Sequence, residues 1–322
     1  RLLAQECARV GIVRPLVVTD PGVKAAGVLQ KALDAMAELP VAVFDQTPPN
    51  PTEAAVRAAA ALYKAQGCDG LVAVGGGSAI DCAKGVAIAV AHEGPLTHYA
   101  TIEGGSPKIT AAAAPLIAVP TTAGTGSEAT PNAILAIPEQ QTKVGIISPV
   151  LLPDYVALLP ELTTSMPASI AASTGIDALC HLLECFTSTV ANPVSDNAAL
   201  IGLHKLVRHI ERSVDQPQDL TAKLEMLWAS WYGGAAINHA GTHLVHALSY
   251  PLGGTWHLPH GVANAVLLPH LMAYNADYTG EKLRDVAKAM GVAGTESLSI
   301  AEARKAAVDA VKQLCKDVGI PP

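Results

Sequence analysis

Long hydrophobic runs are missing from this sequence, although half of its 322 residues are hydrophobic. Its apolar stretches, such as residues 71–74 and 86–91, fall far short of the roughly 20 residues that a helix needs to cross a bilayer. We therefore expect no membrane partner. An excess of basic residues is missing as well, because the formal net charge is −7. This charge excludes the basic surface that a nucleic-acid partner requires and favours a small-molecule partner.

Paired cysteine motifs are also missing. The six cysteines show no C-x-x-C spacing, which is typical of zinc-binding and redox motifs. Several of them lie inside apolar segments, where a free thiol behaves as a small hydrophobic side chain. Scattered free thiols fit a reducing compartment, so we expect a cytoplasmic protein.

The first half of the chain alternates short runs rich in β-branched residues with longer helical stretches. Strands are predicted at residues 15–19, 41–44, 70–74 and 116–119, and helices at residues 23–39, 52–66 and 78–92. This alternation is typical of a parallel sheet with helices on its faces. From about Pro160 onward, Ala- and Leu-rich segments of helical length replace it. We predict a Rossmann-like α/β domain over residues 1–160 and an all-α domain over residues 161–322.

A glycine-rich turn follows the predicted strand at residues 70–74. Gly75, Gly76, Gly77 and Ser78 come directly before a helical pattern. A strand, a glycine turn and a helix N-terminus bring free N–H groups to one point, which suits a pyrophosphate. Ser78 is expected to cap this helix, with Asp81 closing a shortened capping box. An ordinary strand-to-helix turn is the alternative, and the spacing departs from G-x-G-x-x-G.

A second polar loop, PTTAGTGSE at residues 120–128, follows the predicted strand at residues 116–119. Its hydroxyls and free amides suit phosphate and ribose oxygens, although local hydrogen bonds would also explain them. Asp20 lies at the end of the first predicted strand. There it would accept hydrogen bonds from an adenosine ribose and repel a 2′-phosphate, which predicts NAD over NADP. The alternative is an aspartate that only starts a turn before Pro21 and Gly22.

The helical half contains a group of possible metal ligands. Asp177 and His181 are four residues apart, so both project from one face of a helix, and Glu184 shares that face. Residues 239–270 hold six of the eleven histidines of the chain. One carboxylate and several imidazoles suit Fe(II), Zn(II) or a similar ion. Spacing alone does not choose among the histidines.

The sequence resembles the iron-containing (group III) alcohol dehydrogenases, whose fold also includes glycerol dehydrogenase and dehydroquinate synthase. The resemblance runs from about Val17 to Val292. It is carried by the segments VTDP, GGGSAIDCAK, PTTAGTGSEAT, TGIDALCHLLECFTS and HALSYPLGGTWHLPHGVANAVLLPH, and by the Asn50-Pro51 pair. It implies a dinucleotide-binding domain followed by a helical metal-binding domain, the dehydroquinate synthase-like fold.

The resemblance also implies site residues. By position, the metal ligands of the family correspond to Asp177, His181, His246 and His260. The NAD contacts correspond to Asp20, Asn50, Gly76, Gly77, Ser78, Asp81, Thr121, Thr122, Thr125, Thr130 and Lys143. Asn132 corresponds to a position near the substrate pocket.

The sequence departs from the family pattern at two positions. Tyr250 stands where many members have a histidine near the nicotinamide and the proton path. His257 is a possible substitute, and the Tyr250 hydroxyl is the other possibility. Ile237 stands where some relatives place an aromatic side chain over the substrate, which predicts a differently shaped pocket.

The resemblance implies hydride transfer between NAD(H) and a small aliphatic alcohol, or the matching aldehyde or ketone, at Fe(II) or else Zn(II). We also expect a homodimer. One alternative is a lyase like dehydroquinate synthase, which needs basic residues around its substrate, whereas residues 233–269 contain neither Lys nor Arg. A second is a metal-free reductase of the maleylacetate type, disfavoured because all four ligand positions are filled. A third is an NAD-binding module without catalytic activity.

Overall fold

The structure is a computed structural model that describes residues 2–110, 112–138, 142–256 and 258–321. The chain divides into two compact units. The first comprises Arg1–Thr121 with Ser127–Leu162, and the second comprises Thr122–Gly126 with Thr163–Pro322. An α/β unit with a parallel sheet is thus followed by a helical unit, which confirms the predicted fold class.

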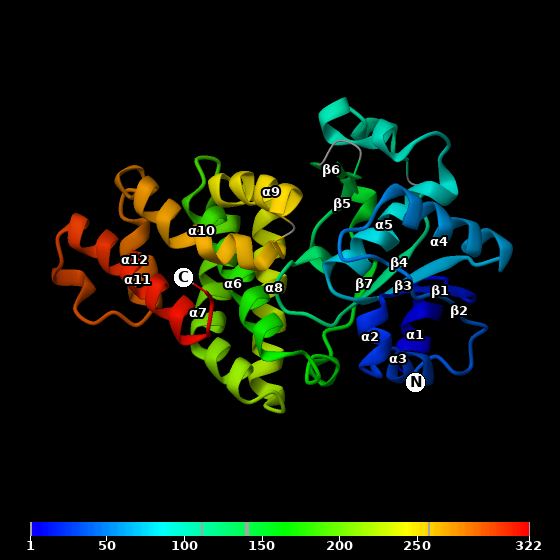
Figure 1. The fold of residues 1–322 in the computed structure, drawn as a ribbon, viewed down its shortest axis with the longest axis horizontal. Helices are drawn as coiled ribbons and strands as arrows, with labels where there is room; N and C mark the ends of the chain where they lie inside the picture. Colours follow the sequence, from blue (N-terminus) through cyan, green and yellow to red (C-terminus); the bar gives the residue numbers. More distant parts are fainter. Residues whose placement is uncertain (1, 111, 139–141, 257, 322) are drawn as a thin grey trace. The chain divides into compact units, whose positions relative to one another are not determined.

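The first unit is built on a five-stranded parallel sheet with the order β2-β1-β3-β4-β7 (Figure 1). Its strands are β1 (Pro15–Val18), β2 (Ala42–Phe44), β3 (Gly70–Gly75), β4 (Leu116–Pro120) and β7 (Tyr155–Val156). The chain runs outward from β1 to β2 and then returns to β3 on the other side of β1. In open α/β sheets, ligands bind beyond the carboxyl ends of the strands where the order reverses in this way. The topology therefore points to the ends of β1 and β3 as the binding crevice.

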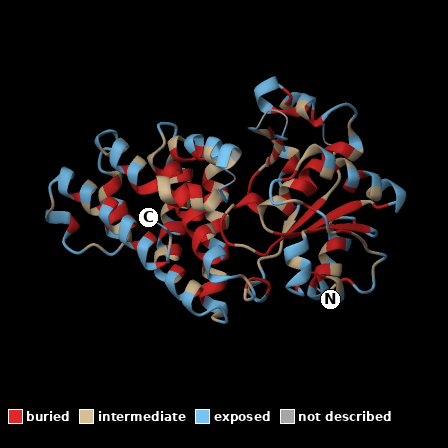
Figure 2. Cartoon of the chain, viewed as in Figure 1, coloured by how far each residue is buried: buried red, intermediate tan, exposed pale blue. Residues whose placement is uncertain are grey.

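Helices cover both faces of this sheet (Figure 1). They are α1 (Leu2–Arg9), α2 (Pro21–Ala25), α3 (Val28–Asp34), α4 (Glu53–Ala65) and α5 (Gly77–Ala91). Within β1, Leu16 and Val18 join the core formed with α4 and α5, whereas Val17 joins the core formed with α1 and α3. Burial on both faces explains why these strands are apolar throughout rather than alternating (Figure 2).

Two features of this unit differ from the sequence prediction. The single helix predicted at residues 23–39 is wrong, because Gly27 adopts a left-handed conformation (φ 72°) and separates α2 from α3. The antiparallel hairpin of β5 (Asn132–Ile137) and β6 (Thr142–Ile147) was not predicted. Buried and half-buried residues alternate along β5, as in a strand with one face on the core.

The second unit is helical throughout its described part. Its helices are α6 (Ala168–Thr187), α7 (Pro193–Asp215), α8 (Leu220–Ala240), α9 (Leu244–Trp256), α10 (His260–Asn275), α11 (Lys282–Ala289) and α12 (Ile300–Asp317). Helix α6 is the central helix: it packs against α7, α8 and α10, and it is buried almost all around (Figure 2). A helix that is apolar on all sides belongs inside a core, and the polar residues on α6 are therefore the ones that require explanation.

Two further features concern the apolar character of the helices and the state of the cysteines. Among the described helices, none combines the length and the apolar character needed to span a bilayer. All six cysteines are free and buried, as expected for thiols that act as small core side chains.

Candidate metal centre and cofactor-binding edge

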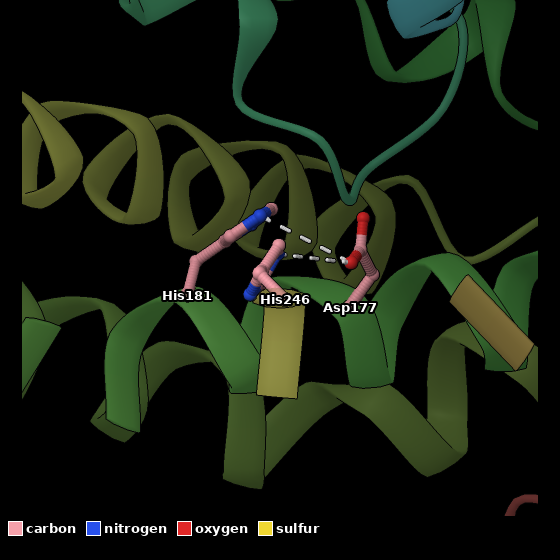
Figure 3. A group of neighbouring side chains, drawn as sticks. All are labelled: Asp177, His181 and His246. Carbon is pink, nitrogen blue, oxygen red and sulfur yellow. Dashed lines mark ion pairs between the residues drawn. The ribbon is translucent and has the colours of Figure 1, made fainter. Parts of the chain in front are cut away.

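Helix α6 carries two buried polar side chains into the core of the helical unit. Asp177 and His181 lie one turn apart on α6, and both are buried (Figure 3). The carboxylate oxygen Oδ1 of Asp177 lies 4.0 Å from Nε2 of His181. The four-residue spacing of the sequence therefore does place both groups on one face.

Two histidines from other helices converge on the same carboxylate oxygen. His246 on α9 is buried, and its Nε2 lies 4.0 Å from Oδ1 of Asp177 (Figure 3). His260 begins α10, and its Nε2 lies 3.7 Å from the same oxygen. Ligands bound at about 2.0 to 2.2 Å from one metal ion lie within about 4.2 Å of each other. These three separations meet that limit.

The charges of these groups also suit a cation. Burial alone would raise the pKa of Asp177, but His181, His260 and His246 outweigh it and hold that pKa below its usual range. Burial lowers the pKa of His181 to about 4, against the opposing effect of Asp177. Near neutral pH the centre therefore offers an anionic oxygen and a neutral imidazole, which are the protonation states that bind a divalent metal. The residues present fit such an ion.

A backbone carbonyl fixes the orientation of His181. Nδ1 of His181 lies 3.2 Å from the carbonyl oxygen of Gly124, so Nδ1 carries the proton and Nε2 keeps its lone pair. The segment Thr122–Gly126 belongs to the helical unit and lies close to its helices. A Cβ atom on Gly124 would come within 2.5 Å of the Thr174 carbonyl oxygen. Close packing on α6 thus explains this glycine, which the sequence suggested as part of a phosphate loop.

Two further buried side chains contact the converging groups. Glu184, one turn beyond His181 on α6, accepts hydrogen bonds from His246 Nδ1 at 2.5 Å and from the backbone N–H of Val245 at 2.6 Å. Asn264 on α10 donates its Nδ2 to Oδ1 of Asp177 at 2.6 Å. From the sequence, Glu184 was predicted only to share the face of Asp177, and Asn264 was not predicted at all. The four-residue spacing of Asn264 after His260 was the available signal.

The residues expected around the substrate lie on three different elements, apart from one that is not described. Tyr250 on α9 is 39% exposed, and its ring stacks on His260 with centroids 6.0 Å apart and planes at 13°. His257 lies outside the described residues. Ile237 lies near the end of α8 and is half-buried. Asn132 begins β5 in the other unit.

In the α/β unit, the predicted cofactor residues lie at the carboxyl edge of the sheet. Asp20 follows β1, Asn50 follows β2, and Thr121 follows β4. Gly75 ends β3, and a Cβ atom there would meet the Ala79 Cβ at 2.5 Å and the Asp20 carboxylate at 3.3 Å. Asp20 and the glycine turn therefore flank the reversal between β1 and β3.

The predicted capping box at the start of α5 is wrong. The N-cap of α5 is Gly76, which offers no side-chain hydrogen bond. Ser78 instead donates its hydroxyl to the Pro49 carbonyl, next to Asn50. Asp81 accepts from the Ser127 hydroxyl at 2.5 Å and from the backbone N–H of Ile134 at 3.2 Å. The first-turn N–H groups of α5 are thus not capped by its own N-cap side chain.

Asp20 does start the turn before Pro21 and Gly22, as the alternative interpretation of this residue predicted. Its Oδ1 accepts from the backbone N–H groups of Gly22 and Val23, and it caps the short helix α2. Such a cap leaves the negative charge at the sheet edge. Its contact with a ribose stays a prediction.

A fully buried lysine connects α5 to the polar loop. Lys84 donates its Nζ to the carbonyl oxygens of Ser127, Thr130 and Asn132 at 2.7, 2.7 and 2.8 Å. Burial lowers its pKa to about 8, against the opposing charges of Asp81 and Glu128. Lys84 was not predicted as a functional residue, although the segment GGGSAIDCAK contains it.

The remaining predicted cofactor residues are spread along the same unit and the loop. Thr121 and Thr130 are buried, and Thr122 and Thr125 are half-buried within the loop segment of the helical unit. Lys143 lies on β6 and acts electrostatically on Asp81. Asn50 is exposed. Their contacts with NAD stay predictions.

Comparison with known proteins agrees with this arrangement. Residues 1–160 match the family model described as iron-containing alcohol dehydrogenase, and residues 171–322 match the C-terminal model of the same family. A 4-hydroxybutyrate dehydrogenase of Cupriavidus necator is 54% identical over 281 residues, which are 86% of this chain and 73% of that protein.

A second relative and a solved structure match over nearly the whole chain. A 1,3-propanediol dehydrogenase of Klebsiella pneumoniae is 40% identical over 99% of this chain and 82% of its own length. The crystal structure of a 1,3-propanediol oxidoreductase superposes with a TM-score of 0.95 at 40% identity, covering 99% of this chain and 83% of that one. The chain belongs to the iron-containing alcohol dehydrogenase family.

Proposed function

We propose that this oxidoreductase transfers hydride between NAD(H) and a short aliphatic alcohol, or its aldehyde, at a divalent metal held by Asp177, His181, His246 and His260. The convergence of Asp177, His181 and His246 inside the helical unit carries the proposal. Burying charged or polar groups is costly unless they are paired or bound to a metal, and this group has the composition of a metal site. The same convergence disfavours a metal-free reductase.

The two cofactors divide the chemistry between them. The metal supplies a Lewis acid for the alcohol oxygen, and NAD accepts or returns the hydride. The four ligand residues would hold the ion: Asp177 would contribute the negative charge, and the Gly124 carbonyl keeps the His181 proton on Nδ1. We propose that the Tyr250 hydroxyl, next to His260, moves the alcohol proton toward solvent. His257 is the other candidate for that step.

We propose residues 1–160 as the NAD-binding domain and residues 161–322 as the metal and substrate domain. The N-terminus of α5, where the N-cap Gly76 has no side chain to occupy the first-turn N–H groups, suits the pyrophosphate together with Gly77 and Ser78. The negative charge of Asp20 at the sheet edge favours the ribose of NAD over the 2′-phosphate of NADP. The turn that holds Thr130 and Asn132 owes its position to Lys84.

The names of the relatives suggest the substrate class. Both 4-hydroxybutyrate and 1,3-propanediol carry a primary hydroxyl on a short chain with a second polar group. We propose a substrate of this kind. Residues 233–269 contain no Lys or Arg, so this segment offers no permanently charged cationic side chain that would favour a hydroxy acid over a diol.

We propose Fe(II) as the metal, with Zn(II) as the alternative, and a cytoplasmic homodimer as the working form. The six buried free thiols suit a reducing compartment. Light scattering on purified protein measures the oligomeric state, and metal analysis after anaerobic purification identifies the ion.

Substrate assays combined with one variant test the proposal. We expect wild-type protein to reduce NAD with 1,3-propanediol or 4-hydroxybutyrate, and His181→Ala to lose this activity while it still binds NADH in a fluorescence titration. Retention of full activity by His181→Ala would refute the proposed centre. Absence of activity toward every short alcohol tested, in metal-loaded wild type, would refute the substrate class.

A further inference from the structure

Glu184 is a buried carboxylate that is not among the four proposed metal ligands. It is 2% exposed and lies in the core of the helical unit. Both of its oxygens accept hydrogen bonds from nitrogen donors. Oε2 accepts from His246 Nδ1 at 2.5 Å, and Oε1 accepts from the Val245 backbone N–H at 2.6 Å. His243 Nδ1 lies 3.1 Å from Oε1 as well.

These contacts determine which nitrogen of His246 carries the proton. An ionised carboxylate only accepts hydrogen bonds, so the His246 nitrogen that faces Glu184 must be the protonated one. The proton is then on Nδ1, and Nε2 keeps its lone pair, which faces the Asn264 Nδ2 donor at 3.2 Å and lies 4.0 Å from Oδ1 of Asp177. His181 shows the same arrangement with the Gly124 carbonyl, and the two rings stack with centroids 4.7 Å apart.

We propose that Glu184 is a positioning residue of the metal centre, which holds His246 in the Nδ1-protonated form so that Nε2 binds the metal. This inference rests on the proposed metal site. Carboxylates behind a ligating histidine fix its tautomer and ring orientation and make it a stronger ligand. Glu184 also adds a second negative charge to a centre in which only Asp177 is an anionic ligand.

A purely structural role is the competing explanation. Val245 is the second residue of α9, so the bond from its N–H to Glu184 satisfies a donor at the helix N-terminus. In that case Glu184 would matter for stability and not for metal binding. A Gln at this position separates the two roles because its amide has one acceptor oxygen and one donor nitrogen. If the amide oxygen of this Gln accepts from the Val245 N–H, its NH₂ group faces Nδ1 of His246. This arrangement favours a proton on Nε2 of His246 instead.

The test compares Glu184→Gln with a control, Glu225→Gln. Glu225 is a half-buried carboxylate of the same unit that pairs with Lys205, away from the proposed ligands. Zn(II) affinity is measured by chelator competition, together with the absorption spectrum of the Co(II)-loaded protein and with NADH binding. We expect Glu184→Gln to bind Zn(II) about 10- to 100-fold more weakly and to change the Co(II) spectrum. Glu225→Gln should keep the Zn(II) affinity and the Co(II) spectrum of the wild type. NADH binding should be unchanged in both variants.

A measurement on the wild type decides the question even if Glu184→Gln fails to fold. In Zn(II)-loaded, ¹⁵N-histidine-labelled protein, NMR correlations assign the ring proton of His246, and we expect it on Nδ1. A proton on Nε2, or a Glu184→Gln variant that keeps wild-type Zn(II) affinity and only melts earlier, would overturn the inference. Failure of wild type itself to bind Zn(II) or Co(II) would instead refute the proposed metal site.

Discussion

The substitution Gly124→Ala tests how a backbone carbonyl supports a proposed metal ligand. The new Cβ would lie 2.5 Å from the Thr174 carbonyl oxygen and 2.6 Å from the Thr174 Cβ, whereas ordinary contacts begin near 3.4 Å. Thr174 O belongs to the backbone of α6, so it cannot rotate away. Relief of the clash requires a shift of about 1 Å, which breaks the 3.2 Å bond between the Gly124 carbonyl and His181.

The magnitude follows from the loss of that buried hydrogen bond. A buried donor left without a partner costs about 1 to 3 kcal/mol. Because about 1.4 kcal/mol corresponds to a factor of ten, a cost of about 1 to 3 kcal/mol borne by the metal-bound state would lower metal affinity about 5- to 150-fold. We expect Gly124→Ala to lose activity at low metal concentration and to regain it when the metal concentration is high enough to fill the weakened site.

The assay is Zn(II) binding by chelator competition, followed by NAD reduction as a function of free metal. Gly145→Ala is the matched control, because the nearest atom to its new Cβ is an Ile134 side-chain carbon at 3.4 Å. Gly145→Ala should bind metal as the wild type does. Wild-type metal affinity in Gly124→Ala would show that the contact with His181 does not support the centre.

Three further predictions concern the cofactor edge and the proton path. Because the pKa of Lys84 in the folded chain is about 8 rather than 10.5, unfolding takes up a proton between these pH values. Relative to Lys84→Met, the wild type should gain up to about 3 kcal/mol of unfolding free energy from pH 8 to 10.5 in urea titrations, and a constant difference would contradict this. Asp20→Ser should lower the KM for NADP about tenfold or more, and an unchanged preference for NAD would argue against a ribose contact. Tyr250→Phe should lower kcat about 100-fold at unchanged metal affinity if its hydroxyl moves the proton, whereas unimpaired turnover would favour His257.

Local sequence patterns predicted the features that depend on neighbours in the chain. Strands buried on both faces showed as continuous apolar runs, and the spacing of Asp177 and His181 placed both on one face of α6. The same local reasoning was wrong where a tertiary partner intervened. Ser78 and Asp81 have capping-box spacing, but Pro49 and Ser127 attract their side chains instead.

Contacts between distant segments were beyond the reach of these patterns. Glu184 becomes informative only when α9 brings Val245 and His246 to it, which lie 61 and 62 residues further along the chain. The partner of His181 is a backbone carbonyl, which has no side-chain signature. The sequence gives no sign that Lys84 is buried, because the turn from Ser127 to Asn132 that accepts its hydrogen bonds lies more than 40 residues away.

Anomalous X-ray scattering from crystals loaded with Zn(II) or Fe(II) tests the central claim most directly. We predict one strong peak at the metal edge, about 2.0 to 2.2 Å from an oxygen of Asp177 and from Nε2 of His181, His246 and His260. A peak elsewhere, or none next to these side chains in fully loaded protein, would contradict it.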